Sequence, residues 1–230
     1  SAASDVYKRQ EFIKGGPERL PVIKEGGLNL KVDPLHGQKT GFFLDQRENR
    51  LCLANIIKGG RGLDLFCYTG AWGLHLAMNG AEVLLIDDSE RALELARENA
   101  ALNNISERCS FLRADVFDYL STTKEKELDF IILDPPAFVK SRSKIEEAVR
   151  GYTFINNASM KLLKKGGILA TSSCSAHISR ELFLDILRRA ARGAGRALRL
   201  IEFRSQAKDH PVLLQVPETE YLKCAILQVL

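Results

Sequence analysis

Two short stretches of the chain carry side chains that could do covalent chemistry. One is SSCS, residues 172–175, in which serines flank Cys174 after an apolar run. A polar, partly exposed thiol of this kind is a candidate nucleophile. The other is LDPPAF, residues 133–138, in which Asp134 follows the apolar run FIIL and precedes two prolines. Proline cannot donate to a strand ladder, so we expect a buried strand to end at Asp134.

The carboxyl ends of parallel strands meet at one edge of an open α/β sheet, and ligands bind at that edge. SSCS and LDPPAF each follow an expected strand. We therefore predict that Cys174, the candidate nucleophile, and Asp134 lie beside each other there.

The sequence DLFCYTGAWG, residues 64–73, occupies the position of a nucleotide-binding loop, between an expected strand and an expected helix. A dinucleotide loop needs glycines there so that the backbone can approach a pyrophosphate. Phe66 and Tyr68 take two of those positions, which disfavours NAD and FAD. S-adenosylmethionine (SAM) has no phosphate and needs less clearance, so the loop favours SAM.

Acidic residues lie at the ends of four successive expected strands, a pattern that favours an adenosine cofactor. An acid in the place of Asp87 can accept hydrogen bonds from both hydroxyls of a ribose. Asp115 is placed to contact an adenine edge, and Ser89 is an expected helix cap. The expected cofactor contacts are Asp64, Phe66, Tyr68, Thr69, Gly70, Asp87, Asp88, Ser89, Asp115, Val116 and Asp134.

Buried runs alternate with helical patterns, which predicts an α/β fold with a doubly wound, mostly parallel sheet. Strands are expected at residues 62–67, 82–86, 110–113, 128–133, 168–171, 198–203 and 221–229. Helices are expected at residues 45–57, 71–79, 89–103, 151–163 and 180–194. The last two strands have no helical pattern between them, so we expect an antiparallel pair. Residues 20–33 alternate around Gly26 and Gly27, which predicts a small β-hairpin ahead of the sheet.

The composition of the 230 residues is that of a soluble globular protein, with 45% hydrophobic and 27% charged residues. No apolar run reaches the length of a membrane span, and no signal-peptide pattern opens the chain, so no membrane partner is expected. Five cysteines without a CxxC pair favour reduced thiols in the cytoplasm. Four scattered histidines argue against a metal site. The net charge of +4 permits a polyanionic partner.

Several stretches in their order along the chain resemble a known family, namely GQKTGFFLDQRENR, DLFCYTGAWG, LDPPAFVK, RGYTFINNASMKLLKKGG, SSCS, and QAKDHPV followed by ETEYLK. The family is the class I SAM-dependent ribosomal RNA large-subunit methyltransferases that make 5-methylcytosine. The resemblance is to the bacterial type with an RNA-binding PUA domain ahead of the catalytic domain, and it runs from about residue 20 to the C-terminus. It implies a Rossmann-like catalytic domain with a seven-stranded sheet and SAM as the methyl donor.

The resemblance also implies that Cys174 is the nucleophile and that large-subunit (23S) ribosomal RNA is the substrate. Thiolate addition at C6 of cytosine makes C5 nucleophilic enough to take a methyl group. A protonated Asp134 could donate to N3 of the base, and Phe138 could stack on a flipped base. Contacts with RNA are expected from Lys39, Arg47, Arg50, Pro135, Phe138 and Lys140.

Two alternatives stay open. Guanine methylation at N7 or N2 needs no cysteine, and a related family shares the GFFLDQR and DPP features. A catalytically silent RNA-binding homologue is the other alternative. Many RNA cytosine-5 methyltransferases carry a second cysteine where this chain has Pro136 and Ala137. The group that releases the product is therefore open, and so is the formation of a homodimer.

The chain is expected to have three parts. Residues 1–12, which resemble a translated sequencing adapter, are expected to be non-native or disordered. Residues 13–44 are expected to form the β-hairpin extension, and residues 45–230 the SAM-dependent methyltransferase domain. We expect the chain to be a fragment that lacks the PUA domain, with weakened affinity for RNA.

Overall fold

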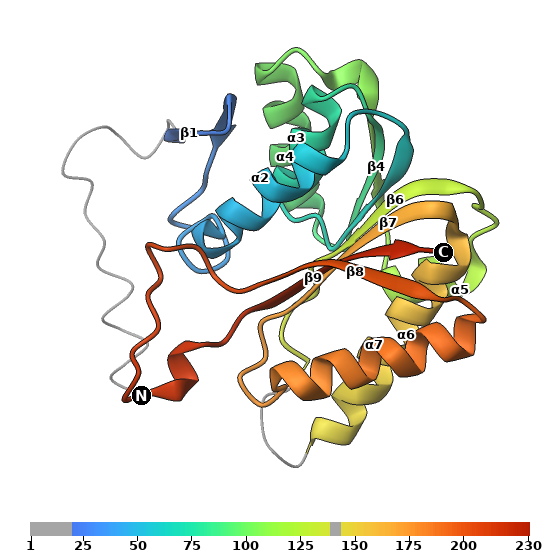
Figure 1. Ribbon diagram of the computed structural model, residues 1–230. Coiled ribbons are helices and arrows are strands. Elements are labelled where there is room, and N and C mark those ends of the chain that lie inside the picture. The colour runs from blue at the N-terminus through green and yellow to red at the C-terminus, as the bar shows by residue number, and fades with distance from the viewer. Residues whose placement is uncertain (1–19, 139–143) are drawn as a thin grey trace.

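The structure, a computed structural model, describes residues 20–138 and 144–230. Its main strands are β3 (Arg61–Leu65), β4 (Glu82–Asp87), β5 (Cys109–Arg113), β6 (Leu128–Leu133), β7 (Leu163–Ser173), β8 (Leu198–Arg204) and β9 (Lys223–Val229). They form a seven-stranded sheet in the order β5-β4-β3-β6-β7-β9-β8 (Figure 1). β9 is antiparallel to β7 and β8, and the other neighbours are parallel. The predicted doubly wound sheet with an antiparallel C-terminal strand is confirmed.

The helices are α2 (Arg47–Ile56), α3 (Ala71–Met78), α4 (Glu90–Leu102), α5 (Val116–Thr122), α6 (Ile145–Leu162) and α7 (Arg180–Ala194), with short 3-10 helices η1 (Leu44–Gln46), η2 (Ser106–Arg108) and η4 (Pro217–Thr219). One face of the sheet carries α2, α3 and α4, and the other carries α5, α6 and α7 (Figure 1). Each face therefore has its own hydrophobic core. Among the described residues, no helix combines the length and the apolar character needed to cross a membrane.

The largest differences from the expected elements concern α5, α6 and β7. The pattern does not predict α5, because its sequence VFDYLST has few strong helix formers and depends on a cap, in which the Asp115 side chain accepts from Asp118 N–H. α6 begins at Ile145 instead of residue 151. β7 begins before Gly166 and Gly167, and its pairing with β6 shifts register in that region.

A two-stranded hairpin precedes the sheet, with strands β1 (Val22–Glu25) and β2 (Leu28–Lys31). Its turn needs glycine, because Gly26 and Gly27 have φ angles of +52° and +92°. β2 is held along α4 by side-chain amides. Asn99 Oδ1 accepts from Lys31 N–H at 2.7 Å, and Asn103 Oδ1 accepts from the backbone of the same strand at 2.8 Å. The hairpin is thereby joined to the helical layer that borders the sheet.

A buried ionic cluster joins this hairpin to α2 and α3. The carboxylate of Glu25 accepts from Arg50 Nε at 2.7 Å and from Arg50 Nη2 at 2.8 Å, and His75 Nε2 lies 3.1 Å from the same carboxylate. Arg50 Nη1 donates to the carbonyl oxygen of Phe43 at 3.0 Å. The expectation that Arg50 contacts RNA phosphate is corrected here, because its guanidinium is buried and all its nitrogens serve protein acceptors.

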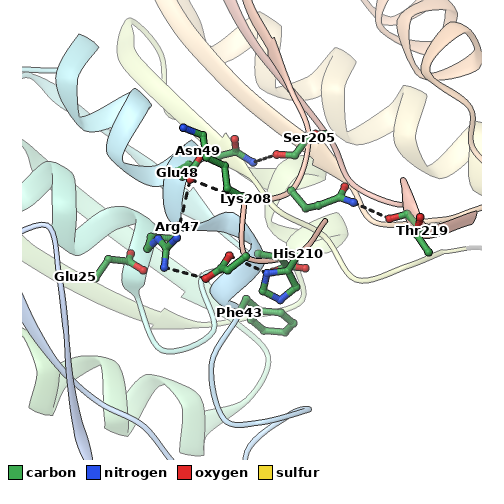
Figure 2. Close-up of polar contacts among 12 residues, drawn as sticks. Glu25, Phe43, Arg47, Glu48, Asn49, Ser205, Lys208, His210 and Thr219 are labelled. Carbon is green, nitrogen blue, oxygen red and sulfur yellow. Dashed lines mark hydrogen bonds and ion pairs between the residues drawn. The ribbon is translucent and has the colours of Figure 1, made fainter. Parts of the chain in front are cut away.

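The segment between β8 and β9, residues 205–222, folds back over η1 and α2. Asn49 Nδ2 donates to the carbonyl oxygen of Ser205 at 3.1 Å (Figure 2). The carbonyl oxygen of Asp45 accepts from Ala207 N–H at 2.8 Å. These contacts attach a region near the C-terminus to η1 and the first turn of α2, and both regions border the cavity described next.

Candidate active site

A cavity of about 590 Å³ opens at the carboxyl edge of the parallel strands. Its walls come from the loops after β3, β4, β5, β6 and β7, with residues 38–46 before α2 and residues 221–222 before β9. Small-molecule sites typically enclose about 300–1,000 Å³ and lie at this edge of α/β sheets. The cavity is therefore the candidate active site.

Most of the residues expected to contact an adenosine cofactor line this cavity, namely Phe66, Tyr68, Thr69, Asp87, Asp88, Asp115, Val116 and Asp134. Two others lie outside the lining and serve helix starts. Gly70 has a φ of +84° at the N-terminus of α3, and Ser89 Oγ accepts from Ala92 N–H at the start of α4. The expected helix cap at Ser89 is thus present.

The expectation that four acids lie at strand ends is wrong for Asp64. It lies inside β3 and is completely buried. Its Oδ2 accepts from Gly73 N–H at 2.8 Å, which ties the strand to α3. Burial raises the pKa of Asp64 to about 8. Asp64 therefore anchors the start of α3 from inside the fold and does not line the cavity.

The loop after β3 is strained and is held by Asp87. Phe66 and Tyr68 have φ angles of +62° and +49°, which are unusual for bulky residues. Asp87 Oδ2 accepts from Tyr68 N–H at 2.8 Å, and Asp87 Oδ1 accepts from Ser89 N–H at 3.0 Å. Burial raises the pKa of Asp87, and these two hydrogen bonds oppose that rise. A carboxylate is thereby fixed at the end of β4, facing the cavity.

An aromatic cluster forms another wall of the cavity. The ring of Phe66 lies 6.5 Å from that of Phe117 and 6.4 Å from that of Phe138. Phe138 also packs 4.6 Å from Tyr152, a buried residue of α6. The prolines after Asp134 thus lead directly to a ring that is anchored on one side and borders the cavity on the other.

Asp134 has a donor on each carboxyl oxygen. Gln46 Nε2 donates to Oδ1 at 2.8 Å and Trp72 Nε1 donates to Oδ2 at 3.0 Å. Gln46 Nε2 also lies 3.1 Å from Ser172 Oγ, so it links the ends of β6 and β7. Burial raises the pKa of Asp134, and the two donors oppose that rise. The group is therefore easier to protonate than an ordinary aspartic acid.

Cys174 follows β7 and lines the cavity together with Asp134. Its Sγ lies 4.0 Å from the carbonyl oxygen of Pro135, so SSCS and LDPPAF do meet at one edge of the sheet. Burial raises the pKa of the thiol, the charge of Asp134 raises it further, and Lys39 lowers it. Among the cysteines, Cys67 and Cys224 are buried, as is usual for a small apolar side chain.

Some of the expected RNA contacts line the cavity, namely Lys39, Arg50, Pro135 and Phe138, although the Arg50 guanidinium is buried. Arg47 is not part of the cavity lining, and its Nη1 forms an ion pair with Asp209 Oδ2 at 2.9 Å (Figure 2). Lys140 lies outside the described residues. Among the described residues, no group of three His, Cys, Asp or Glu side chains could hold a metal ion.

Sequence reasoning did not identify several residues that shape the site. Gln46 and Trp72 donate hydrogen bonds to Asp134. They lie in the stretches GFFLDQR and GAWG, and only the polar and aromatic content of these stretches could have pointed to a role in the site. Phe117 follows the predicted Val116 by one residue. Asp45 and Tyr221 also line the cavity, and the Tyr221 hydroxyl donates to Asp45 Oδ2 at 2.8 Å. No local pattern connects residues so far apart in the chain.

The chain is similar to proteins of known class. A family model described as S-adenosylmethionine-dependent methyltransferase matches residues 6–223. Ribosomal RNA large subunit methyltransferase I of Aeromonas hydrophila is 42% identical over 227 residues, which cover 96% of this chain and 57% of that protein. The protein of the same name from Escherichia coli is 42% identical over 211 residues, covering 90% of this chain and 53% of that protein. The chain thus spans little more than half the length of these relatives.

The fold is similar to that of a solved protein with a related ligand. The crystal structure of SMU.776 complexed with SAH (S-adenosylhomocysteine) has a TM-score of 0.84 at 25% identity, over 95% of this chain and 58% of that one. SAH is SAM without its transferable methyl group, so this likeness and the family match agree on SAM as the cofactor. The family model covers well over half of the chain, and the chain belongs to the S-adenosylmethionine-dependent methyltransferases.

Proposed function

We propose that this protein methylates C5 of a cytosine in large-subunit (23S) ribosomal RNA. The name shared by the relatives, Ribosomal RNA large subunit methyltransferase I, supports the class of substrate. The observation that carries the choice of base and atom is the position of Cys174 beside Asp134 on the wall of the cavity. A carbon atom of cytosine needs covalent activation by a nucleophile, whereas a ring nitrogen of guanine does not.

The residues that would hold SAM are those at the ends of β4 and β5 and in the loop after β3. Asp87 would take the ribose hydroxyls, and Asp115 and Val116 the adenine. The lining fits this cofactor, because acidic groups and the aromatic rings of Phe66 and Phe117 suit a cation without phosphates. When bound, SAM supplies the methyl group that cytosine C5 accepts.

The protein groups activate the base in two ways. The Cys174 thiolate adds to C6, which places electron density on C5 and makes that carbon nucleophilic. Asp134, when protonated, donates to N3 as the adduct forms. Burial raises the pKa of Asp134 and so favours the protonated form that this role needs. Phe138 offers an anchored ring on which a flipped base could stack.

The two roles support each other electrostatically. The charge of Asp134 is one cause of the raised thiol pKa of Cys174, after burial. Protonation of Asp134 removes that repulsion and makes the thiolate easier to form. Lys39, which lowers the thiol pKa, acts in the same direction. A neutral Asp134 therefore serves both the addition at C6 and the hydrogen bond at N3.

Nucleoside mass spectrometry tests the proposed reaction. Unmodified large-subunit RNA, transcribed in vitro, is incubated with the protein and SAM and then digested to nucleosides. We expect 5-methylcytidine as the new nucleoside. A new 7-methylguanosine or N2-methylguanosine without 5-methylcytidine would instead support guanine methylation.

Replacing Asp87 tests the cofactor site. Asp87→Asn should weaken SAM binding by about 1.5–3 kcal/mol, the range of a hydrogen bond to a charged group. Titration calorimetry measures this change, with circular dichroism to check the fold. Glu82→Gln is a matched control, because Glu82 is exposed at the other end of the same strand and should keep wild-type affinity. A folded Asp87→Asn protein with wild-type affinity would remove Asp87 from the site.

A further inference from the structure

We propose that Asp45 is the general base that removes the proton from C5 and so releases the methylated RNA, an inference that rests on the proposed cytosine-5 function. Pro136 and Ala137, which follow Asp134 on the cavity lining, carry no side-chain group that can accept a proton. After methyl transfer, C5 carries both a methyl group and a hydrogen, and C6 is still bonded to Cys174. A base on the cavity wall must take that hydrogen as a proton.

Asp45 lines the same cavity as the proposed nucleophile. It lies in η1, lines the cavity with Cys174 and Asp134, and directly precedes Gln46, which donates to Asp134. Its charge also contributes to the raised pKa of Asp134, for which burial is the main cause, and to that of Cys174. Asp45 is therefore within electrostatic reach of both groups that act on the base.

The carboxylate of Asp45 has one oxygen fixed and one available. The Tyr221 hydroxyl donates to Oδ2 at 2.8 Å. Oδ1 makes no hydrogen bond with any of the described residues, although the residue as a whole is only 5% exposed. A nearly covered carboxylate that keeps one open oxygen on a cavity can accept a proton from a bound substrate.

The backbone around Asp45 is held in place by the segment 205–222. The Asp45 carbonyl oxygen accepts from Ala207 N–H, and Glu48 Oε1 accepts from Lys208 N–H at 3.4 Å in the first turn of α2 (Figure 2). Tyr221 belongs to the same segment. Contacts from both ends of this segment therefore fix the orientation of the Asp45 carboxylate before any substrate binds.

Other polar groups of the cavity fit this role less well. Asp88 and Asp115 follow β4 and β5, at the end of the cavity proposed for the adenosine. The ammonium of Lys39 has no lone pair to accept a proton. Tyr152 packs against Phe138 but is not part of the cavity lining, and its hydroxyl lies 3.3 Å from Ser175 Oγ. Among the carboxylates that line the cavity, Asp45 is one whose charge acts on Cys174 and that has no part in the earlier steps.

The proposed elimination balances in protons and electrons. Asp45 takes the C5 proton, and the electron pair of that C–H bond forms the C5–C6 double bond. The C6–S bond breaks, and its electron pair leaves with Cys174 as a thiolate. The proton that N3 received returns to Asp134, and Asp45 later gives its proton to water. The product is neutral 5-methylcytosine, and no further reactant is needed.

The test uses tritium-labelled methyl groups and separates the two halves of the reaction. On unsubstituted large-subunit RNA, Asp45→Asn should form methylated product 10²–10⁴-fold more slowly, the range of a general base. The protein should instead accumulate on denaturing gels as a labelled covalent adduct with RNA, which Cys174→Ala in the same chain abolishes. On RNA that contains 5-fluorocytosine, which blocks elimination, Asp45→Asn should form as much adduct as wild type.

The controls give each outcome a meaning. Asp185→Asn makes the same chemical change at an exposed ion pair of α7 and should behave as wild type. The role of Asp45 is overturned if the Asp45→Asn protein forms methylated product at the wild-type rate. It is also overturned if that protein fails to form the 5-fluorocytosine adduct. A wild-type protein that makes neither 5-methylcytidine nor a 5-fluorocytosine adduct overturns the proposed function itself, whatever the variant does.

Discussion

Cys174→Ala should lower RNA methylation by roughly 10³–10⁶-fold, the range seen when an enzyme loses its nucleophile. The thiolate makes the bond to C6 that activates C5, and the other groups of the site cannot form that bond. Cys174→Ser should fail as well, because a serine hydroxyl is scarcely ionised near neutral pH. Initial rates of 5-methylcytidine formation, followed by mass spectrometry, measure the loss.

The control for this prediction is Cys52→Ala. Cys52 is a partly buried cysteine of α2 that does not line the cavity, so its replacement should leave the rate within a few-fold of wild type. SAM affinity should be unchanged in Cys174→Ala, because the residue lies at the β6–β7 side of the site. A Cys174→Ala protein that methylates RNA at the wild-type rate would rule out the cysteine mechanism and favour guanine as the target.

Glu25→Ala should destabilise the protein by about 3–5 kcal/mol, because it leaves the Arg50 guanidinium buried without its counter-charge. Both side chains of this pair are only 2% exposed. For a domain of this size the loss corresponds to a fall in melting temperature of roughly 6–20 °C. Urea unfolding measures the free energy of unfolding. Glu98→Ala, which breaks the exposed ion pair with Lys31, should cost about 1 kcal/mol or less.

The same cluster predicts a dependence of stability on pH. Burial alone would raise the pKa of Glu25, but the hydrogen bonds from His75 and Arg50 outweigh it, and the pKa falls from 4.5 to about 2. The pKa of Glu25 is lower in the folded than in the unfolded protein. The stability that the Glu25 carboxylate contributes is therefore fully present above its unfolded-state pKa and is lost as the pH falls toward 2. Between pH 5 and 2, the free energy of unfolding should therefore fall more steeply with decreasing pH for wild type than for Glu25→Ala. Equal slopes would contradict this account.

The strands and helices follow from patterns that are local in sequence. The strand expected at 128–133 and the helix expected at 180–194 match β6 and α7, because each is an apolar pattern bounded by breakers or caps. α5 shows the limit of this reasoning, since its stability depends on the Asp115 cap and on packing against α6 more than on its own residues.

The site is less predictable because its contacts join distant parts of the chain. The positions of Asp134 and Cys174 follow from strand ends, which a sequence pattern reveals. No strand-end pattern reveals the hydrogen-bond partners of Asp134, because Gln46 comes from η1 and Trp72 from α3. Arg50 was expected to bind phosphate because a basic residue in a polar stretch is usually exposed. Its burial depends on Glu25 in the hairpin, which no local pattern links to α2.

The most direct test of the account is the identity of the residue that becomes bonded to RNA. Large-subunit RNA transcribed with 5-fluorocytosine is incubated with wild-type protein and SAM, and the protein is digested and its peptides sequenced by mass spectrometry. We expect a methylated 5-fluoropyrimidine on Cys174, in a SAM-dependent reaction that Cys174→Ala abolishes. Methylation of unsubstituted RNA by a protein that forms no such adduct, or an adduct on another residue, would contradict it.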